Sequence, residues 1–74
     1  MGEETKNDKF RRLAMARGNR ALRDIELLGN LSNRNNYEYT PDQIRLIFSA
    51  IEDEVRIAKQ RFSGGAQAKR EISL

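Results

Sequence analysis

Apolar side chains recur at helical spacing in two separate stretches of the 74-residue chain. A helix turns about 100° per residue, so an apolar residue at every third or fourth position lines one face. The two stretches predict helices over residues 8–28 and 40–62, joined by an Asn-rich connector, 29–39. A polar leader over residues 1–7 and a flexible tail over residues 63–74 lack this pattern, and we expect the folded domain between them.

The second stretch has the clearer pattern. Thr40 is a good N-cap, Pro41 suits the first helical position, and Gln43 completes a Thr-x-x-Gln capping box. Apolar residues then follow at alternating spacings of four and three, the heptad pattern of a helix–helix seam. This seam comprises Ile44, Phe48, Ile51, Val55, Ala58 and Phe62.

A second apolar stripe lies on the same predicted helix, more than about 100° from the seam. It contains Leu46, Ala50 and Ile57. Single exposed apolar residues are common on protein surfaces, but three on one face of so small a chain favour an interface. A helix with two apolar faces needs two neighbours, and this chain supplies only one other helix.

The first predicted helix carries small residues on its apolar face. Gly18 lies between Ala14 and Ala21, a placement that predicts the close approach of another helix. Asn7 or Asp8 is expected to cap the start of this helix. Gly29 and Asn30 are expected to end it in a left-handed cap. The whole apolar face comprises Phe10, Ala14, Gly18, Ala21, Leu22, Ile25 and Leu28.

The chain is short for a stable core, and small domains usually recruit disulfides, a metal or a partner subunit. It contains no Cys and no His, which excludes disulfides and the usual zinc sites. Other helices are what remains. We therefore predict an all-α fold, an antiparallel helical hairpin over residues 8–62 that self-associates, with a dimer forming a four-helix bundle.

The residue types also argue against catalysis. Without His or Cys there is no Ser–His or Cys–His nucleophile system. The consecutive acids Glu52, Asp53 and Glu54 point about 100° apart around a helix, so they do not converge on one site. There is no Gly-rich phosphate loop. We predict no enzyme activity, no cofactor and no metal site within one copy.

Charge is distributed unevenly along the chain. The net charge is +3, from 14 basic and 11 acidic residues, and ten of the basic residues are Arg. Residues 8–28 carry the whole excess, whereas residues 40–62 are neutral. Arg is the side chain whose planar fork suits phosphate and carboxylate. The first helix is therefore the part of the chain suited to an anionic ligand.

Three arginines, Arg12, Arg20 and Arg23, fall on the polar face of the first helix. They are candidates to bind phosphates or an acidic partner. The alternative is that Arg20 and Arg23 pair at short range with Asp24 and Glu26, and that this face only keeps a small oligomer in solution.

The connector offers three more candidate ligand-binding residues. Arg34 could bind a phosphate, Asn35 could contact a base edge, and Tyr37 could stack on a ring. The alternative is that the Asn residues shape the backbone while Tyr37 and Tyr39 close the end of the hairpin. At eleven residues the connector is longer than the turn of a typical helix-turn-helix motif.

Three segments together resemble a signature of small bacterial two-helix proteins. They are Asn19 to Leu22, Leu27 to Asn33, and Asn36-Tyr37-Glu38-Tyr39. The core of this signature is Leu-Gly-Asn-Leu-Ser-Asn followed by Asn-Tyr-x-Tyr, and the likeness covers about residues 10–62. The resemblance implies a helical hairpin and carries no activity, ligand or site with it.

The main functional hypothesis is a non-enzymatic, self-associating helical protein that binds nucleic acid or a nucleotide through the Arg-rich helix and the connector. The alternative is a regulator or inhibitor, bacterial or phage-type, that captures a larger protein through the stripe of Leu46, Ala50 and Ile57. The N-terminus is polar and no run approaches the ~18 apolar residues of a membrane span. We therefore expect a cytoplasmic protein with no membrane partner.

Overall fold

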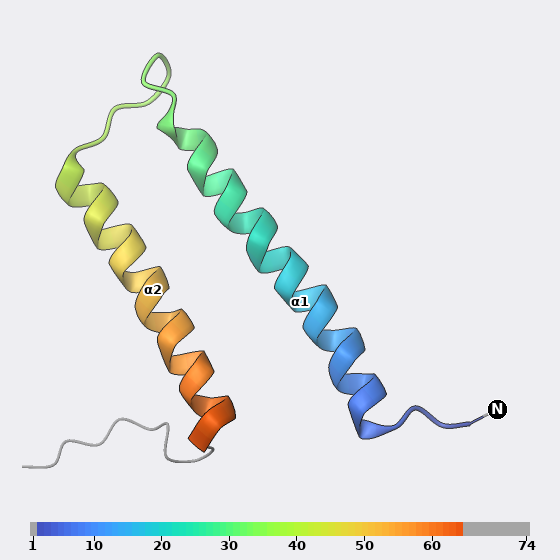
Figure 1. Cartoon of the computed structure of the whole chain (residues 1–74). Helices are drawn as coiled ribbons and strands as arrows, with labels where there is room; N and C mark the ends of the chain where they lie inside the picture. Colours follow the sequence, from blue (N-terminus) through green and yellow to red (C-terminus); the bar gives the residue numbers. More distant parts are fainter. Residues whose placement is uncertain (1, 65–74) are drawn as a thin grey trace, which may run out of the picture. The chain divides into compact units, whose positions relative to one another are not determined.

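The computed structural model describes residues 2–64, and every regular element in that range is helical (Figure 1). Helix α1 spans Lys6–Gly29, the short 3-10 helix η1 spans Asn30–Ser32, and helix α2 spans Pro41–Gly64. This confirms the all-α class. The expected tail falls mostly outside the described residues, apart from Ser63 and Gly64, which belong to α2.

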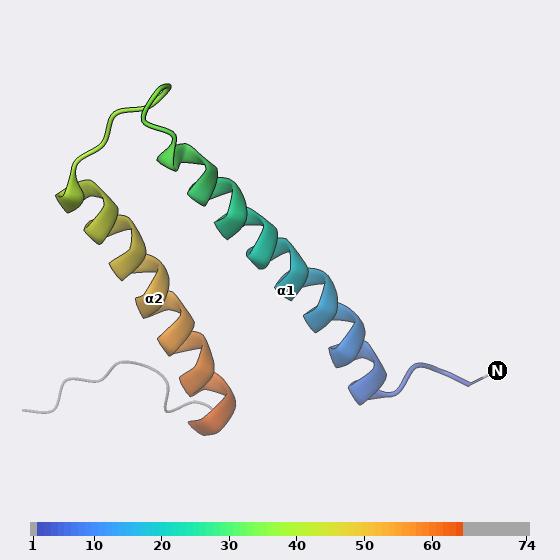
Figure 2. The same cartoon turned by 45° about the horizontal axis from the view of Figure 1, so that its top comes forward.

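The chain divides into two units, Met1–Glu38 and Tyr39–Leu74. The first unit contains α1 and η1, which contact each other, and the second contains α2. Figure 2 shows the same helices from a second direction. All candidate anion-binding residues belong to the first unit, and the seam and second stripe belong to the second.

Helix α1 begins two residues earlier than predicted, and the expected cap at Asn7 or Asp8 is wrong. Thr5 is the N-cap: its hydroxyl accepts a hydrogen bond from the Asp8 backbone N–H at 2.9 Å. The Asp8 carboxylate accepts one from the Thr5 N–H at 3.2 Å. This reciprocal pair is a capping box with Asp in the place of the usual Glu or Gln.

The expected left-handed cap at the end of α1 is also wrong. Gly29 (φ −63°, ψ −26°) and Asn30 (φ −67°, ψ −15°) are both right-handed. The chain tightens into η1, and the Asn30 N–H points at carbonyl oxygens in the last turn of α1, beginning with that of Glu26. A 3-10 turn is another way to satisfy the carbonyls at a helix end, so no left-handed residue is required here.

The connector after η1 is organised by Asn33. Its side-chain oxygen accepts a hydrogen bond from the Asn35 N–H at 2.9 Å. Its main-chain oxygen accepts from the N–H groups of Asn36 and Tyr37, at 3.1 and 3.0 Å. The Asn side chain therefore replaces a backbone carbonyl in closing a turn, as the backbone-shaping alternative predicted for this segment.

Helix α2 begins as predicted. The Thr40 hydroxyl accepts from the Gln43 N–H at 3.1 Å, and the Gln43 side chain accepts from the Thr40 N–H at 2.9 Å. Pro41 is the first helical residue, where its missing N–H costs nothing. The helix ends later than predicted, because Ser63 continues it and its hydroxyl donates to the Gln60 carbonyl.

No side chain among residues 2–64 is fully buried. The best-covered apolar residues are half-buried, namely Leu13, Leu28, Ile44, Ile51 and Ile57. Phe62 is 77% exposed and Leu22 is 68% exposed, although both lie on apolar helix faces. Each helix is therefore amphipathic, and its apolar side remains partly exposed to solvent.

Candidate functional site

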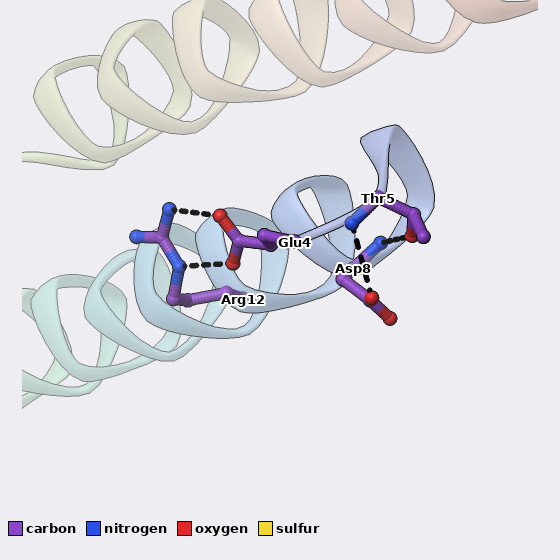
Figure 3. Close-up of polar contacts among 4 residues, drawn as sticks. All are labelled: Glu4, Thr5, Asp8 and Arg12. Atoms are coloured by element: carbon purple, nitrogen blue, oxygen red, sulfur yellow. Dashed lines mark hydrogen bonds and ion pairs between the residues drawn. The ribbon is translucent and has the colours of Figure 1, made fainter. Parts of the chain in front are cut away.

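Arg12, the first candidate, is held by a carboxylate from the leader. Its guanidinium donates two hydrogen bonds to Glu4, from Nε to Oε2 at 2.8 Å and from an Nη2 to Oε1 at 3.1 Å (Figure 3). Glu4 is placed for this contact by the Thr5–Asp8 capping box next to it. The fork of Arg12 is thus matched to a carboxylate in the geometry that also suits phosphate.

The pairing shifts the pKa values of both Glu4 and Arg12. The hydrogen bond from Arg12 lowers the pKa of the Glu4 carboxyl, and the positive charge of Arg12 acts in the same direction. The same hydrogen bond raises the pKa of Arg12. Both side chains are well exposed, so the pair is accessible to solvent and to a competing anion. A ligand at Arg12 must displace Glu4.

Arg20 and Arg23 are in a different situation. No carboxylate in the described part of the chain forms an ion pair with either of them, so the short-range pairing with Asp24 and Glu26 is absent there. Both arginines line the same shallow hollow on the surface of α1. The hollow is lined by Ala16, Asn19, Arg20, Leu22, Arg23 and Glu26.

The composition of this hollow decides what it can bind. Arg20 and Arg23 are one turn apart, about 4.5 Å along the helix axis, so both can reach the same anionic group. The Asn19 amide adds a neutral donor, and Leu22 provides an apolar side. The Glu26 carboxylate is the one group in the lining that opposes an anion, and it leaves the hollow with one net positive charge.

Arg12 lies too far along α1 to share this hollow. Eight residues separate it from Arg20, which is about 12 Å of helix. The three arginines nonetheless fall within an arc of about 80° on the helix surface, because each residue advances about 100° around the helix and their separations are close to whole numbers of turns. The structure therefore forms a line of cations on one side of α1, with no single pocket.

The connector candidates are exposed and close to the end of α1. Arg34, Asn35 and Tyr37 all have exposed side chains, and Tyr37 remains 47% exposed. Asn35 contributes only its backbone N–H to the turn at Asn33, so its amide is available to a ligand. Tyr39 is half-buried, in contrast to Tyr37. Of the two tyrosines, Tyr37 is the one placed for stacking.

The second unit has a different arrangement of charge. Arg45 pairs with Asp42 at 2.9 Å, and Arg56 pairs with Asp53 at 3.3 Å, both one turn apart on α2. The stripe residues Leu46 and Ala50 are exposed, and Ile57 is half-buried. Two of the arginines of α2 thus form ion pairs with aspartates on their own helix, whereas Arg20 and Arg23 of α1 form none among the described residues.

Sequence reasoning missed Glu4, because it assigned the leader no role. The signal was present in the spacing Thr5-x-x-Asp8, which is a capping-box pattern that starts the helix two residues earlier. With that start, Glu4 stands immediately before the first turn, where its carboxylate reaches Arg12.

Over residues 2–64, neither helix has a window apolar enough to cross a membrane. Comparison with known proteins found no matching family model, no similar curated protein and no similar solved structure. The functional argument therefore depends on the residues of this chain alone.

Proposed function

We propose that this protein is a non-enzymatic, self-associating helical protein that binds nucleic acid along the arginine-bearing side of α1. The phosphate backbone is the ligand, and the connector residues Arg34, Asn35 and Tyr37 add contacts near the end of the helix. The contacts are to phosphates first, because these give affinity without sequence preference.

One observation carries the proposal. Arg20 and Arg23 share a hollow and lack a carboxylate partner among the described residues, whereas Arg45 and Arg56 of α2 each have one. A surface that serves only solubility gains nothing from leaving its arginines without ion pairs. A surface that binds an anion does, because a paired Arg must first release its partner.

The spacing of the cations favours a polymer over a single nucleotide. A nucleotide could occupy the hollow between Arg20 and Arg23, but it could not also reach Arg12, about 12 Å away. Successive phosphates along a strand can follow a line of cations of this kind. Tyr37 is exposed and suits a single strand, because unpaired bases stack on aromatic rings without sequence preference.

Self-association is the second part of the proposal. It is supported by the exposure of apolar side chains on both helices, among them Phe62 and Leu22. Burial of such side chains contributes about 1.5–3 kcal/mol each, which is the main driving force available to a chain of this size. We propose that the two helices pack as an antiparallel hairpin and that two hairpins form a four-helix bundle.

The test is a binding titration of the full chain against three fluorescent probes: a single-stranded oligonucleotide of about 20 residues, the corresponding duplex, and ATP. Anisotropy is measured at about 50 and 200 mM salt, where phosphate contacts lose affinity steeply. We expect binding to the single strand at low salt, weaker binding to the duplex, and the weakest binding to ATP, which can reach only Arg20 and Arg23. Absence of binding to both nucleic acids at low salt would refute the proposal, and tight ATP binding would replace the polymer with a nucleotide.

A second candidate function, capture of a larger protein, is favoured by one observation. Leu46 is 63% exposed at the N-terminal end of the stripe that it forms with Ala50 and Ile57. If this stripe binds a foreign protein, Leu46→Asp abolishes recovery of one stoichiometric, nuclease-insensitive partner while nucleic-acid binding is unchanged. If Leu46→Asp has no effect on any partner, the stripe has no such role.

A further inference from the structure

The seam of α2 is the longest regular apolar surface in the described chain. It comprises Ile44, Phe48, Ile51, Val55, Ala58 and Phe62. These residues continue over five turns at heptad spacing, yet none of them is buried. The surface matches the stripe by which one helix pairs with a copy of itself, and the charges beside it indicate how such a copy is oriented.

Four charged side chains flank the seam without an ion pair in the described residues. Glu52 and Lys59 lie on one side, and Glu54 and Arg61 on the other. The pairs that α2 does form, Asp42–Arg45 and Asp53–Arg56, use the two aspartates, which lie away from the seam. Glu54 and Lys59, on opposite sides of the seam, are therefore available to pair with a second helix.

We propose that α2 forms a parallel, in-register pair with α2 of a second copy of this chain. In a parallel pair, the residues just before Phe48 and Val55 each face the residue five places later on the other helix. This places Glu54 opposite Lys59 of the partner subunit. By symmetry the contact occurs twice, and Glu52 faces the apolar side chain of Ile47 of the partner subunit.

The antiparallel arrangement with the same overlap has the opposite electrostatics. Full overlap of the seam places Ile44 against Phe62 of the partner subunit, so residues pair around the centre of the helix. Glu54 then faces Glu54 of the partner subunit, Glu52 faces Glu52 of the partner subunit, and Arg45 faces Lys59 of the partner subunit. Like charges at these positions oppose association. The flanking charges therefore select the parallel pair.

This inference deepens the self-association in the proposed function and rests on it. It assigns the seam to the second copy and leaves the stripe of Leu46, Ala50 and Ile57 for a different helix. It does not depend on nucleic-acid binding, so the two parts can fail separately.

The first test uses charge variants, with the dissociation constant of the dimer measured by sedimentation equilibrium. Glu54→Gln removes two ion pairs in the parallel dimer, and we expect about three- to fivefold weaker association. Glu52→Gln is the matched control and should change it by less than about twofold. In the antiparallel dimer both substitutions relieve repulsion, and tighter association of either variant would overturn the proposal.

Charge reversal gives a more stringent version. Glu54→Lys alone should weaken the dimer more than Glu54→Gln. It places the new lysine side chain opposite Lys59 of the partner subunit in both symmetry-related contacts, so each ion pair becomes a repulsion. The double variant Glu54→Lys with Lys59→Glu should recover the association of the original chain, since the pair is restored with its signs exchanged. Failure of the double variant to recover would contradict direct contact between these positions.

The second test reads orientation directly. The chain has no Cys, so single Cys variants at the two ends of the seam, Ile44→Cys and Phe62→Cys, are clean probes. The two variants are mixed in glutathione buffer and the disulfides are analysed by mass. A parallel dimer brings like positions together and yields 44–44 and 62–62 disulfides. A predominant 44–62 disulfide would establish the antiparallel dimer instead.

The outcomes distinguish the inference from the proposed function. A dimer with 44–62 disulfides overturns the parallel arrangement and leaves self-association and nucleic-acid binding intact. A mass of 8.6 kDa at all concentrations overturns both the dimer and its orientation. Loss of oligonucleotide binding with an intact parallel dimer overturns only the nucleic-acid part of the proposed function.

Discussion

Helices α1 and α2 have the same length, 24 residues each, and both begin at a threonine with a capping box. They differ in what they leave unpaired. On α1, Arg20 and Arg23 have no acidic partner among the described residues, and the apolar face has small residues at its centre. On α2, the outer arginines are paired with aspartates and the apolar face carries bulky side chains at heptad spacing.

The difference indicates a division of roles between the two units. Bulky apolar residues in register suit another helix, because they can interdigitate with a matching row. A line of arginines suits an extended anion: Arg20 and Arg23 can exchange water for phosphate without first breaking an ion pair, and only Arg12 has to release Glu4. Both helices begin with the same kind of capping box, so the contrast lies in the side chains on their faces.

The largest expected effect comes from breaking the seam. Ile51→Asp places a carboxylate in the middle of the apolar contact, where it must lose its hydration. We expect the dimer to dissociate about 100-fold or more readily, measured by light scattering over a concentration series. Leu46→Asp on the second stripe is the matched control for helix propensity, and it should leave the α2 pair in place. An Ile51→Asp variant that still dimerises would show that the seam is not the contact.

The next effect tests the arginines of the two helices against each other. The double variant Arg20→Gln, Arg23→Gln should bind a single-stranded oligonucleotide about tenfold less tightly at low salt. Its salt dependence should also be shallower, by up to about 1.4 in the slope of log K against log salt. The paired arginines provide the control: Arg45→Gln with Arg56→Gln should leave both affinity and slope nearly unchanged. Equal losses from the two double variants would mean that net charge alone matters.

Removing either helix cap should cost a similar free energy of helix stability, but the two changes should affect dimerisation differently. Thr5→Ala and Thr40→Ala each remove a capping hydroxyl, which costs about 1 kcal/mol of helix stability. Urea unfolding followed by circular dichroism measures this cost. Thr40→Ala should weaken the dimer more than Thr5→Ala, because α2 carries the seam that pairs directly with the second copy. Stronger weakening by Thr5→Ala would make α1 the main dimer contact instead.

The smallest expected effect concerns Glu4 and Arg12. Because hydrogen bonding to Arg12 lowers the pKa of Glu4, this contact stabilises the chain above the ordinary glutamate pKa of about 4.3 and is lost as pH falls through the lowered value. In a carboxyl-detected NMR titration, Arg12→Gln should raise the pKa of Glu4 relative to the original chain. A Glu4 pKa that is the same in both chains would contradict the pair.

Replacing Glu4 also links the two roles of Arg12. Glu4→Gln removes the internal carboxylate, so Arg12 is free to bind phosphate, and oligonucleotide affinity should rise by about twofold. Glu3→Gln changes the net charge by the same amount without freeing Arg12, and it should raise affinity less. An equal rise in both variants would mean that Glu4 acts only through net charge.

Much of the local structure was predictable because its signals are local. The pattern Thr40-Pro41-x-Gln43 predicted the start of α2, and the structure confirms both hydrogen bonds of its capping box. The same kind of signal, Thr5-x-x-Asp8, marks the start of α1 two residues before the predicted one. The predicted left-handed cap at the end of α1 is wrong for a different reason. Gly followed by Asn is compatible with a left-handed cap and with a 3-10 turn, and the residue types alone do not distinguish the two.

The sequence by itself determined the all-α class, the two helices, and the placement of the arginines on one face of α1, because these follow from spacing along a helix of known period. Only the three-dimensional placement of the side chains decided which arginines have partners. Glu4 reaches Arg12 across eight residues, Arg20 and Arg23 do not pair with Asp24 and Glu26, and Asn33 closes the connector turn. Such contacts depend on side-chain direction and on competition between neighbouring partners. A one-dimensional pattern places these groups near one another but does not select among them.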